Sequence, residues 1–257
     1  MGIQLHKEVY TYKMSHRVWP TFQATRNDGS LVKLRIQDLP ENRIDEAVHL
    51  YIQYYIHDET LLKMAGISQN PKAVKEYELL ISELIKDPAS LSMICCEDDE
   101  NSNVRQIVGV SMMSLITVER RDLFRKLQPE TDEMRLYLQW ENIFNFDLIK
   151  HMKDQQIDSY YDDIGLIVHP RFRKLGIATE FARARRWACV AQNVAAASAV
   201  VTSIGTKKIA KKDHWSTVKD FNLDDLGQRY GVTCEEGATV RVVYWKNPEY
   251  KHNEIEK

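Results

Sequence analysis

The sequence predicts an α/β fold in which one mixed sheet is flanked by helices. Strand-like and helix-like runs follow one another along the chain, no internal repeat or low-complexity tract interrupts them, and 257 residues suffice for one substantial core. We expect a single domain over residues 31–246, preceded by a hairpin extension over residues 1–30 and followed by a charged tail over residues 247–257.

The first half of the chain predicts a hairpin, two helices and two strands. Residues 8–38 alternate polar and apolar positions around the turn-forming sequence Arg-Asn-Asp-Gly, which is typical of a hairpin. Apolar positions then recur at helical spacing in two segments, and the second segment ends at an Asp-Pro pair. The expected elements are a strand over 31–38, helices from residue 39 and over 73–85, and strands over 90–96 and 106–117.

The second half predicts three helices that alternate with three strands. The apolar run that ends at Thr202 is rich in β-branched residues toward its end, which favours a strand over a continued helix. The expected elements are a helix over 131–153, a strand that ends near residue 168, a helix from residue 177, a strand over 194–202, a short helix near residue 207 and a strand over 239–245.

Composition argues against several classes of partner. The formal net charge is −2 and basic residues are spread along the chain, so nucleic acid is not an expected partner. The sequence has no apolar run long enough to span a membrane, and its first residues lack the apolar core of a secretion signal. Four cysteines without metal-ligand spacing predict no metal site and fit a reducing compartment, so we expect a cytoplasmic protein.

Residues 163–179 are the most informative stretch for function. A buried strand leads into a short basic turn with one glycine, Gly176, and then into a helix with a regular apolar face. Unpaired amides, a helix dipole and a residue without a side chain therefore coincide, as binding of a diphosphate requires. The turn lacks the glycine patterns of nucleoside-triphosphate and dinucleotide sites. The alternative is an ordinary strand-to-helix connection with basic residues.

The pattern Arg173-x-x-Gly176-x-Ala178, with its preceding strand and following helix, resembles the acyl-CoA-binding motif of the GCN5-related N-acetyltransferase (GNAT) superfamily. The order of the predicted elements also matches the GNAT fold, a mostly antiparallel sheet flanked by helices, with the N-terminal hairpin added. This resemblance implies acetyl-CoA as co-substrate and no metal. The implied cofactor-binding residues are Leu166, Ile167, Val168, Arg171, Arg173, Lys174, Leu175, Gly176, Ile177, Ala178 and Thr179.

Two further stretches resemble motifs of the insect arylalkylamine N-acetyltransferases. The sequence His-Asp-Glu-Thr-Leu at 57–61 resembles their Asp-Glu-Pro-Leu motif, which implies that Glu59 is the general base, although threonine replaces the proline. The sequence Thr-Ser-Ile-Gly-Thr at 202–206 resembles their Thr-Ser-x-Tyr-Ser run. Thr202 and Thr206 then occupy the positions of two functional serines.

The resemblance implies an N-acetyltransferase in which a small primary amine, either arylalkylamine or polyamine-like, attacks the thioester directly. His57 is a rival base because an unperturbed imidazole titrates near neutral pH. Glu141 or Asp147 can hold a second cationic group of the amine, or the aromatic residues around them can simply pack a helix onto the core. A catalytically silent CoA-binding or sensing domain and a protein N-acetyltransferase are the alternative functions. The sequence leaves the preferred amine, the acyl length and the oligomeric state open.

Overall fold

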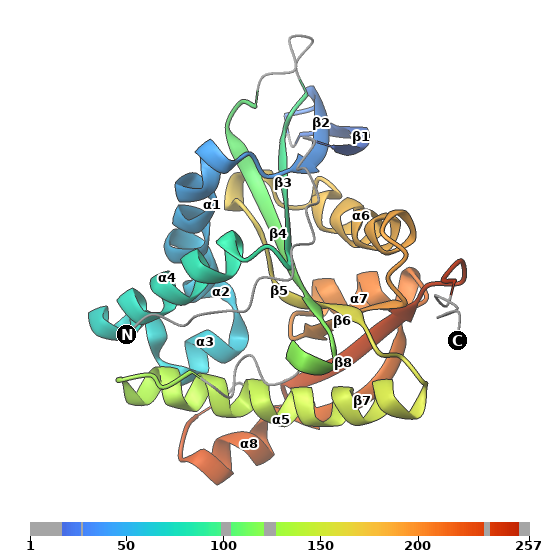
Figure 1. Ribbon diagram of the computed structural model, residues 1–257. Helices are drawn as coiled ribbons and strands as arrows, with labels where there is room; N and C mark the ends of the chain where they lie inside the picture. Colours follow the sequence, from blue (N-terminus) through green and yellow to red (C-terminus); the bar gives the residue numbers. More distant parts are fainter. Residues whose placement is uncertain (1–16, 27, 99–103, 121–126, 234–236, 252–257) are drawn as a thin grey trace.

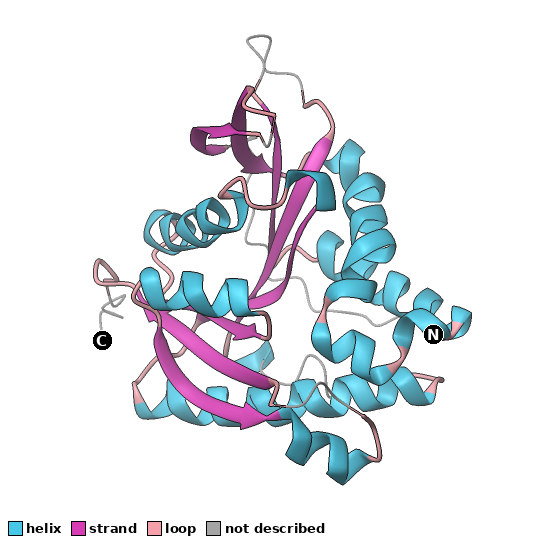
Figure 2. Ribbon diagram, turned by 180° about the vertical axis from the view of Figure 1, so that it is seen from behind, coloured by secondary structure: helices cyan, strands magenta, loops and turns pink. Residues whose placement is uncertain are grey.

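The computed structural model describes residues 17–26, 28–98, 104–120, 127–233 and 237–251, which form one eight-stranded sheet with helices on both faces (Figures 1 and 2). The strand order is β1-β2-β3-β4-β5-β6-β8-β7, and every neighbouring pair is antiparallel except β5 and β6. The strands are β1 Val18–Thr25, β2 Leu31–Asp38, β3 Ser90–Glu97, β4 Ile107–Ile116, β5 Tyr160–Val168, β6 Ala196–Val201, β7 Ser216–Asn222 and β8 Thr239–Lys246. The predicted mixed sheet and its N-terminal hairpin, β1 and β2, are confirmed, and the part of the predicted hairpin over residues 8–16 lies outside the described residues.

The helices include every one that the sequence predicted, within a few residues at each end. None within the described ranges is both long and apolar enough to cross a membrane. They are α1 Ile44–Leu50, the π-helical turn η2 Tyr51–Tyr55, α2 Ile56–Asp58, α3 Thr60–Ala65, α4 Pro71–Lys86, α5 Asp132–Asp154, α6 Ile177–Ala191, α7 Ile204–Lys212 and α8 Leu223–Tyr230, with 3₁₀ turns η1 Glu41–Arg43, η3 Ile67–Gln69, η4 Val118–Arg120 and η6 Pro170–Phe172.

Two large hydrophobic cores cover the two faces of the sheet, and a small third cluster packs α7 against β6 and β8. Ile94 on β3 belongs to the larger core, which α1 to α5 build, whereas its neighbours Met93 and Cys95 belong to the core under α6. This division follows from the strand geometry, because successive side chains point to opposite faces. A strand buried on both faces needs an apolar run, which is why the buried part of β3, residues 93–96, is entirely apolar and β4 is interrupted only by Ser111 and Ser114.

The helical segment between β2 and β3 breaks at Glu59. This residue is extended, with φ −70° and ψ 130°, and it separates α2 from the short helix α3, which the sequence analysis missed. Gly66 ends α3 in the left-handed conformation at φ 78°. Asn70 then caps α4, whose first residue is Pro71.

Strands β5 and β6 separate almost as soon as they meet. Their only registered pair is Tyr161 with Ala197, and the pairing is parallel. A bulge in β5 increases the divergence, because Asp163 lies opposite Met113 and Gly165 lies opposite Met112 on β4, with one residue of β5 left between. From the bulge to Val168, β5 pairs with β4 on one side, whereas on the side that faces β6 no strand of the described chain pairs with it. The two strands run apart in Figure 1.

Candidate active site

The turn between β5 and α6 has a defined backbone geometry. The amide of His169 donates to the Val108 carbonyl at 2.9 Å, and the imidazole Nδ1 accepts from the Arg171 amide at 3.2 Å, which starts the 3₁₀ turn η6. Lys174 and Gly176 then adopt left-handed conformations, at φ 66° and 80°. A Cβ atom on Gly176 would meet no heavy atom within 4 Å, so the space beside its backbone is open.

This turn fits a bound diphosphate. Gly176 is the N-cap of α6, and no side chain caps the helix there. The first amides of α6 and the positive end of its dipole therefore face the open space next to Gly176. Arg171 and Lys174 are exposed at the same turn and can add positive charge.

Arg173 lies between the turn and the segment that carries Glu59. Its guanidinium forms an ion pair with Asp58, and its Nε donates to the Val168 carbonyl at 3.2 Å. Among the other predicted cofactor residues, Ile167 and Ile177 are buried in the cores. Only the backbone of those two can face a cofactor. Leu166, Leu175, Ala178 and Thr179 are partly exposed.

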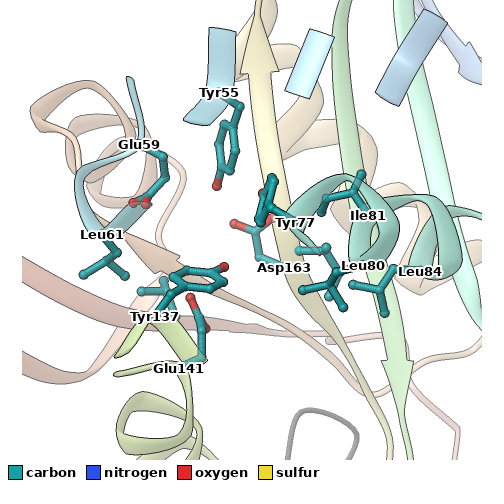
Figure 3. A pocket seen from close by; sticks show the side chains of 12 residues that line it. Tyr55, Glu59, Leu61, Tyr77, Leu80, Ile81, Leu84, Tyr137, Glu141 and Asp163 are labelled. Atoms are coloured by element: carbon teal, nitrogen blue, oxygen red, sulfur yellow. The ribbon is translucent and has the colours of Figure 1, made fainter. Parts of the chain in front are cut away.

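A small pocket opens at the bulge of β5, on the side of α3, α4 and α5. Its volume is about 30 Å³. It contains carboxylates from three different segments, and none of the residues that line it is Lys, Arg or His. Figure 3 shows Glu59 entering from the α2–α3 break and Tyr137 and Glu141 entering from α5. The lining residues are Tyr55, Glu59, Leu61, Tyr77, Leu80, Ile81, Leu84, Tyr137, Glu141, Asp163, Ile164 and Val200.

Glu59 is held from two sides. Its carboxylate accepts a hydrogen bond from the Leu62 amide at 2.8 Å, so it is the N-cap of α3. Burial raises the pKa of Glu59, and hydrogen bonds from the Leu62 amide and the Thr202 hydroxyl oppose that rise. Thr202 follows β6, across the split in the sheet, so the fold brings together two of the residues that the sequence analysis named.

Thr206 has a different environment from Thr202. Its amide donates to Ser203 Oγ at 3.0 Å, and its hydroxyl donates to the Ser203 carbonyl at 3.0 Å. These are the bonds of a capped helix start, because Ser203 is the N-cap of α7. His57, the rival base, is exposed and does not line the pocket.

The structure distinguishes Glu141 from Asp147, the two candidates for holding a second cationic group of the amine. Asp147 forms an ion pair with Lys219 at 2.8 Å and lies outside the pocket lining. Glu141 lines the pocket, and burial together with the nearby Glu59 raises the pKa of Glu141 to about 8. The neighbouring rings of Trp140 and Phe144 are fully buried and belong to the core, as the packing alternative supposed.

Local sequence patterns do not indicate Asp163, Tyr77 or Tyr137 as residues of the site. Asp163 accepts from Arg185 Nη2 at 2.6 Å, and Arg185 Nε donates to Ser111 Oγ at 2.9 Å. The Arg185 and Asp163 side chains are only 4% and 15% exposed, so this is a largely buried ion pair. The four-residue spacing of Tyr137 and Glu141 on a helix was the available signal for a shared face.

The pocket carboxylates do not form a metal site. Within the described ranges, no group of three or more His, Cys, Asp or Glu side chains has an arrangement that could hold a metal ion. Arg185 is the counter-ion of Asp163, and no Lys, Arg or His lines the pocket beside Glu59 and Glu141.

Comparison with known proteins identifies the fold. No protein-family model and no curated protein matches the sequence. A putative arylalkylamine N-acetyltransferase 7 from the mosquito Aedes aegypti superposes with a TM-score of 0.79 at 23% identity, covering 90% of this chain and 95% of the other. Arylalkylamine N-acetyltransferase 2 from Aedes aegypti gives 0.65 at 14% identity, with 83% and 98% coverage.

A polyamine N-acetyltransferase from Drosophila melanogaster that forms N-acetylagmatine gives a TM-score of 0.63 at 11% identity, with 83% and 99% coverage. At these identities the likeness concerns the fold. The chain therefore has the GNAT fold that the sequence resemblance predicted, in the form seen in insect arylalkylamine N-acetyltransferases.

Proposed function

We propose that this protein is an acetyl-CoA-dependent N-acetyltransferase that acts on a small primary amine, with Glu59 as the general base. One observation carries the proposal. Strand β5 joins the two halves of the site, because its bulge lines the pocket of Glu59 and its end leads into the uncapped start of α6. A diphosphate-binding turn and an acidic pocket therefore lie on the same open edge of the sheet.

The residues present fit acetyl-CoA. The amides at the start of α6, the open space at Gly176 and the exposed Arg171 and Lys174 suit its pyrophosphate. The free edge of β5 from Leu166 to Val168 offers backbone groups to the extended amide-containing arm. When bound, acetyl-CoA supplies the acetyl group as an activated thioester.

Glu59 is suited to prepare the amine. An aliphatic ammonium with a pKa near 10 must lose a proton before attack, which costs roughly 4 kcal/mol at neutral pH, at 1.36 kcal/mol per unit. Since burial raises the pKa of Glu59, its carboxylate is a stronger base than an exposed glutamate. The neutral amine would then form the C–N bond as the C–S bond breaks, and the proton that the nitrogen loses on becoming an amide would go to the leaving thiolate.

Thr202 contributes by position. The Thr202 side chain opposes the rise in the pKa of Glu59, so it compensates part of the charge of that carboxylate. Thr206 is already engaged in the cap of α7, and we assign it a structural role at the start of that helix.

The pocket favours a small amine over a protein substrate. Its volume of about 30 Å³ is far below the several hundred Å³ of sites for drug-sized molecules, and apolar side chains from α4 enclose it. The structural relatives include enzymes described as acting on arylalkylamines and on a polyamine-type amine. Both classes carry the ammonium that an acidic pocket selects.

Release of free thiol from acetyl-CoA, measured across a panel of primary amines, tests the proposal. We expect turnover with at least one amine and a loss of about 10²–10⁴-fold in kcat for Glu59→Gln, the usual contribution of a general base. Glu83→Gln, an exposed glutamate of α4 outside the pocket, is the matched control and keeps full activity. Binding of CoA without turnover of any amine would instead establish a silent CoA-binding module.

A further inference from the structure

The pocket is lined by a buried tyrosine whose hydroxyl lacks a hydrogen-bond partner. Tyr77 is 1% exposed, it lines the pocket, and its hydroxyl has no hydrogen-bond partner in the structure. A buried hydroxyl without a partner costs roughly 1–3 kcal/mol. Buried groups of this kind in native proteins usually have an explanation, and one explanation is a substrate group.

Glu141 lines the same pocket, and no cationic side chain in the lining pairs with it. It stands one turn after Tyr137 on α5, and its side-chain hydrogen bond is with the Tyr137 hydroxyl. No cation lines the pocket. Asp163 has its own counter-ion in Arg185, whereas the cationic partner of Glu141 is missing from the residues that enclose it.

The pocket thus has two acidic positions with different surroundings. Glu59 enters from the α2–α3 break and is hydrogen-bonded by Leu62 and Thr202. Glu141 enters from α5 beside Tyr137, and Tyr77 from α4 lines the same pocket (Figure 3). In the proposed reaction, the ammonium that loses its proton lies at Glu59. Glu141 is then available to a second donor on the same molecule.

We propose that Glu141, with the hydroxyls of Tyr77 and Tyr137, binds a second basic nitrogen of the acceptor, so that the preferred substrate is a compact amine with two basic nitrogens. This inference rests on the proposed function and narrows it. An amine that ended in a hydrocarbon ring would leave the buried Tyr77 hydroxyl without a partner and would place apolar surface against Glu141. Sites built to hydrogen-bond a substrate group reject analogues that lack the group by large factors.

The pocket volume supports the compactness of this substrate. About 30 Å³ leaves room for only about two water molecules, so even a short diamine must displace side chains. The apolar walls from Leu80, Ile81 and Leu84 suit the methylene groups between two nitrogens.

The test compares 1,4-diaminobutane with 1-aminopentane, which has nearly the same shape but lacks the second nitrogen. Acetyl transfer is measured for the full chain, together with shorter and longer diamines. We expect kcat/KM to favour at least one diamine over its matched monoamine by tenfold or more. We expect Glu141→Gln to reduce that ratio by at least tenfold.

Two further variants complete the design. Tyr77→Phe removes only the hydroxyl and should lower the same ratio, which keeps the test open if Glu141→Gln does not fold. Asp147→Asn lies on the same helix outside the pocket and should leave the ratio unchanged. Equal use of diamines and monoamines by the wild-type protein, or an unchanged ratio in both pocket variants, would overturn the inference.

Failure of the proposed function gives a different result. If no amine is acetylated, the transferase assignment is lost, and calorimetric binding of 1,4-diaminobutane and 1-aminopentane in the presence of CoA still decides this inference. Tighter binding of the diamine that Glu141→Gln removes would support the second-nitrogen site. Equal or absent binding of both amines would reject it.

Discussion

The carboxylate of Glu59 accepts a hydrogen bond from the Leu62 amide at 2.8 Å, so the candidate base is also the cap of the helix that follows it. This bond satisfies one of the free amides at the start of α3 and fixes the carboxylate at the pocket. A base that serves as a cap is oriented by the backbone, and it needs little further support from side chains.

The double role of Glu59 predicts that two substitutions differ in stability. Glu59→Gln keeps an oxygen for the cap and removes the desolvated acid, so its thermal midpoint at neutral pH should equal or exceed that of the wild type. Glu59→Ala loses the cap, at a cost of about 0.5–2 kcal/mol, and should unfold at a lower temperature than Glu59→Gln. Calorimetry of both variants checks this order. A midpoint for the alanine variant at or above that of the glutamine variant would show that the cap contributes nothing.

The threonines at 202 and 206 should respond differently to loss of the hydroxyl. Thr202→Val removes a hydrogen bond that lowers the pKa of Glu59, so that pKa rises further and the acid limb of kcat/KM moves to higher pH. We expect activity near neutral pH to fall about fivefold, equivalent to ~1 kcal/mol for one hydrogen bond. Thr206→Val should lower the unfolding temperature through the α7 cap and leave the pH profile in place. A pH–rate series for both variants separates the two roles.

Most of the fold and about half of the candidate site could be predicted from the sequence. Elements with a near-continuous apolar run, such as β4, or a regular apolar face, such as α6, were predictable because burial dictates their side chains. β7 and α8 were missed. β7 is an edge strand with mostly exposed residues, so its sequence has little apolar alternation, and α8 follows it directly.

The half of the site contributed by motifs was predictable, and the half contributed by packing was not. Glu59 and Gly176 stand in local patterns that can be compared along the chain. Tyr77 belongs to the pocket only because α4 packs beside α5, and the role of Asp163 depends on a bulge that pairing with β4 creates. No local pattern records such contacts.

Gly176 should matter for CoA binding in a way that another left-handed glycine does not. Gly176→Ala strains a backbone at φ 80°, at a cost of about 1 kcal/mol, and adds a methyl group to the open space beside the first amides of α6. Gly231→Ala is the matched control, because Gly231 has φ 68°, open space around it, and a position at the end of α8. Both variants should lose similar stability.

Only Gly176→Ala should weaken CoA binding, by about tenfold or more, which corresponds to roughly 1.4 kcal/mol. Titration calorimetry with CoA measures this directly. Equal affinities of the two glycine variants would remove the turn from the cofactor site.

The ion pair of Arg185 and Asp163 should be strongly coupled. Arg185→Met leaves Asp163 largely buried without its counter-ion, and breaking such a pair typically costs 3–5 kcal/mol. The double variant with Asp163→Asn should lose less stability than the sum of the two single variants, by at least about 1 kcal/mol. Urea unfolding of the four proteins gives this coupling energy. Strict additivity would mean that the pair is not formed in solution.

Glu141 should make the protein less stable as the pH rises. The pKa of this carboxyl is about 8 in the folded chain, because burial and the nearby Glu59, Asp162 and Asp163 disfavour its charge and the Tyr137 hydrogen bond offsets little of this. Its ordinary value is 4.5, so the folded state holds a proton that the unfolded state has lost between pH 4.5 and 8. Stability then falls with rising pH through that window and levels off above it.

Glu141→Gln removes this dependence because an amide does not titrate. We expect the variant and the wild type to unfold at the same temperature near pH 4.5, and the variant to be more stable at pH 8.5 by at least about 3 °C, which is roughly 1 kcal/mol for a chain of this size. Glu83→Gln, the exposed control on α4, should show no such divergence. Thermal midpoints that stay parallel across the pH range for Glu141→Gln and wild type would mean that Glu141 ionises normally, and that the pocket floor is open to water rather than reserved for a substrate nitrogen.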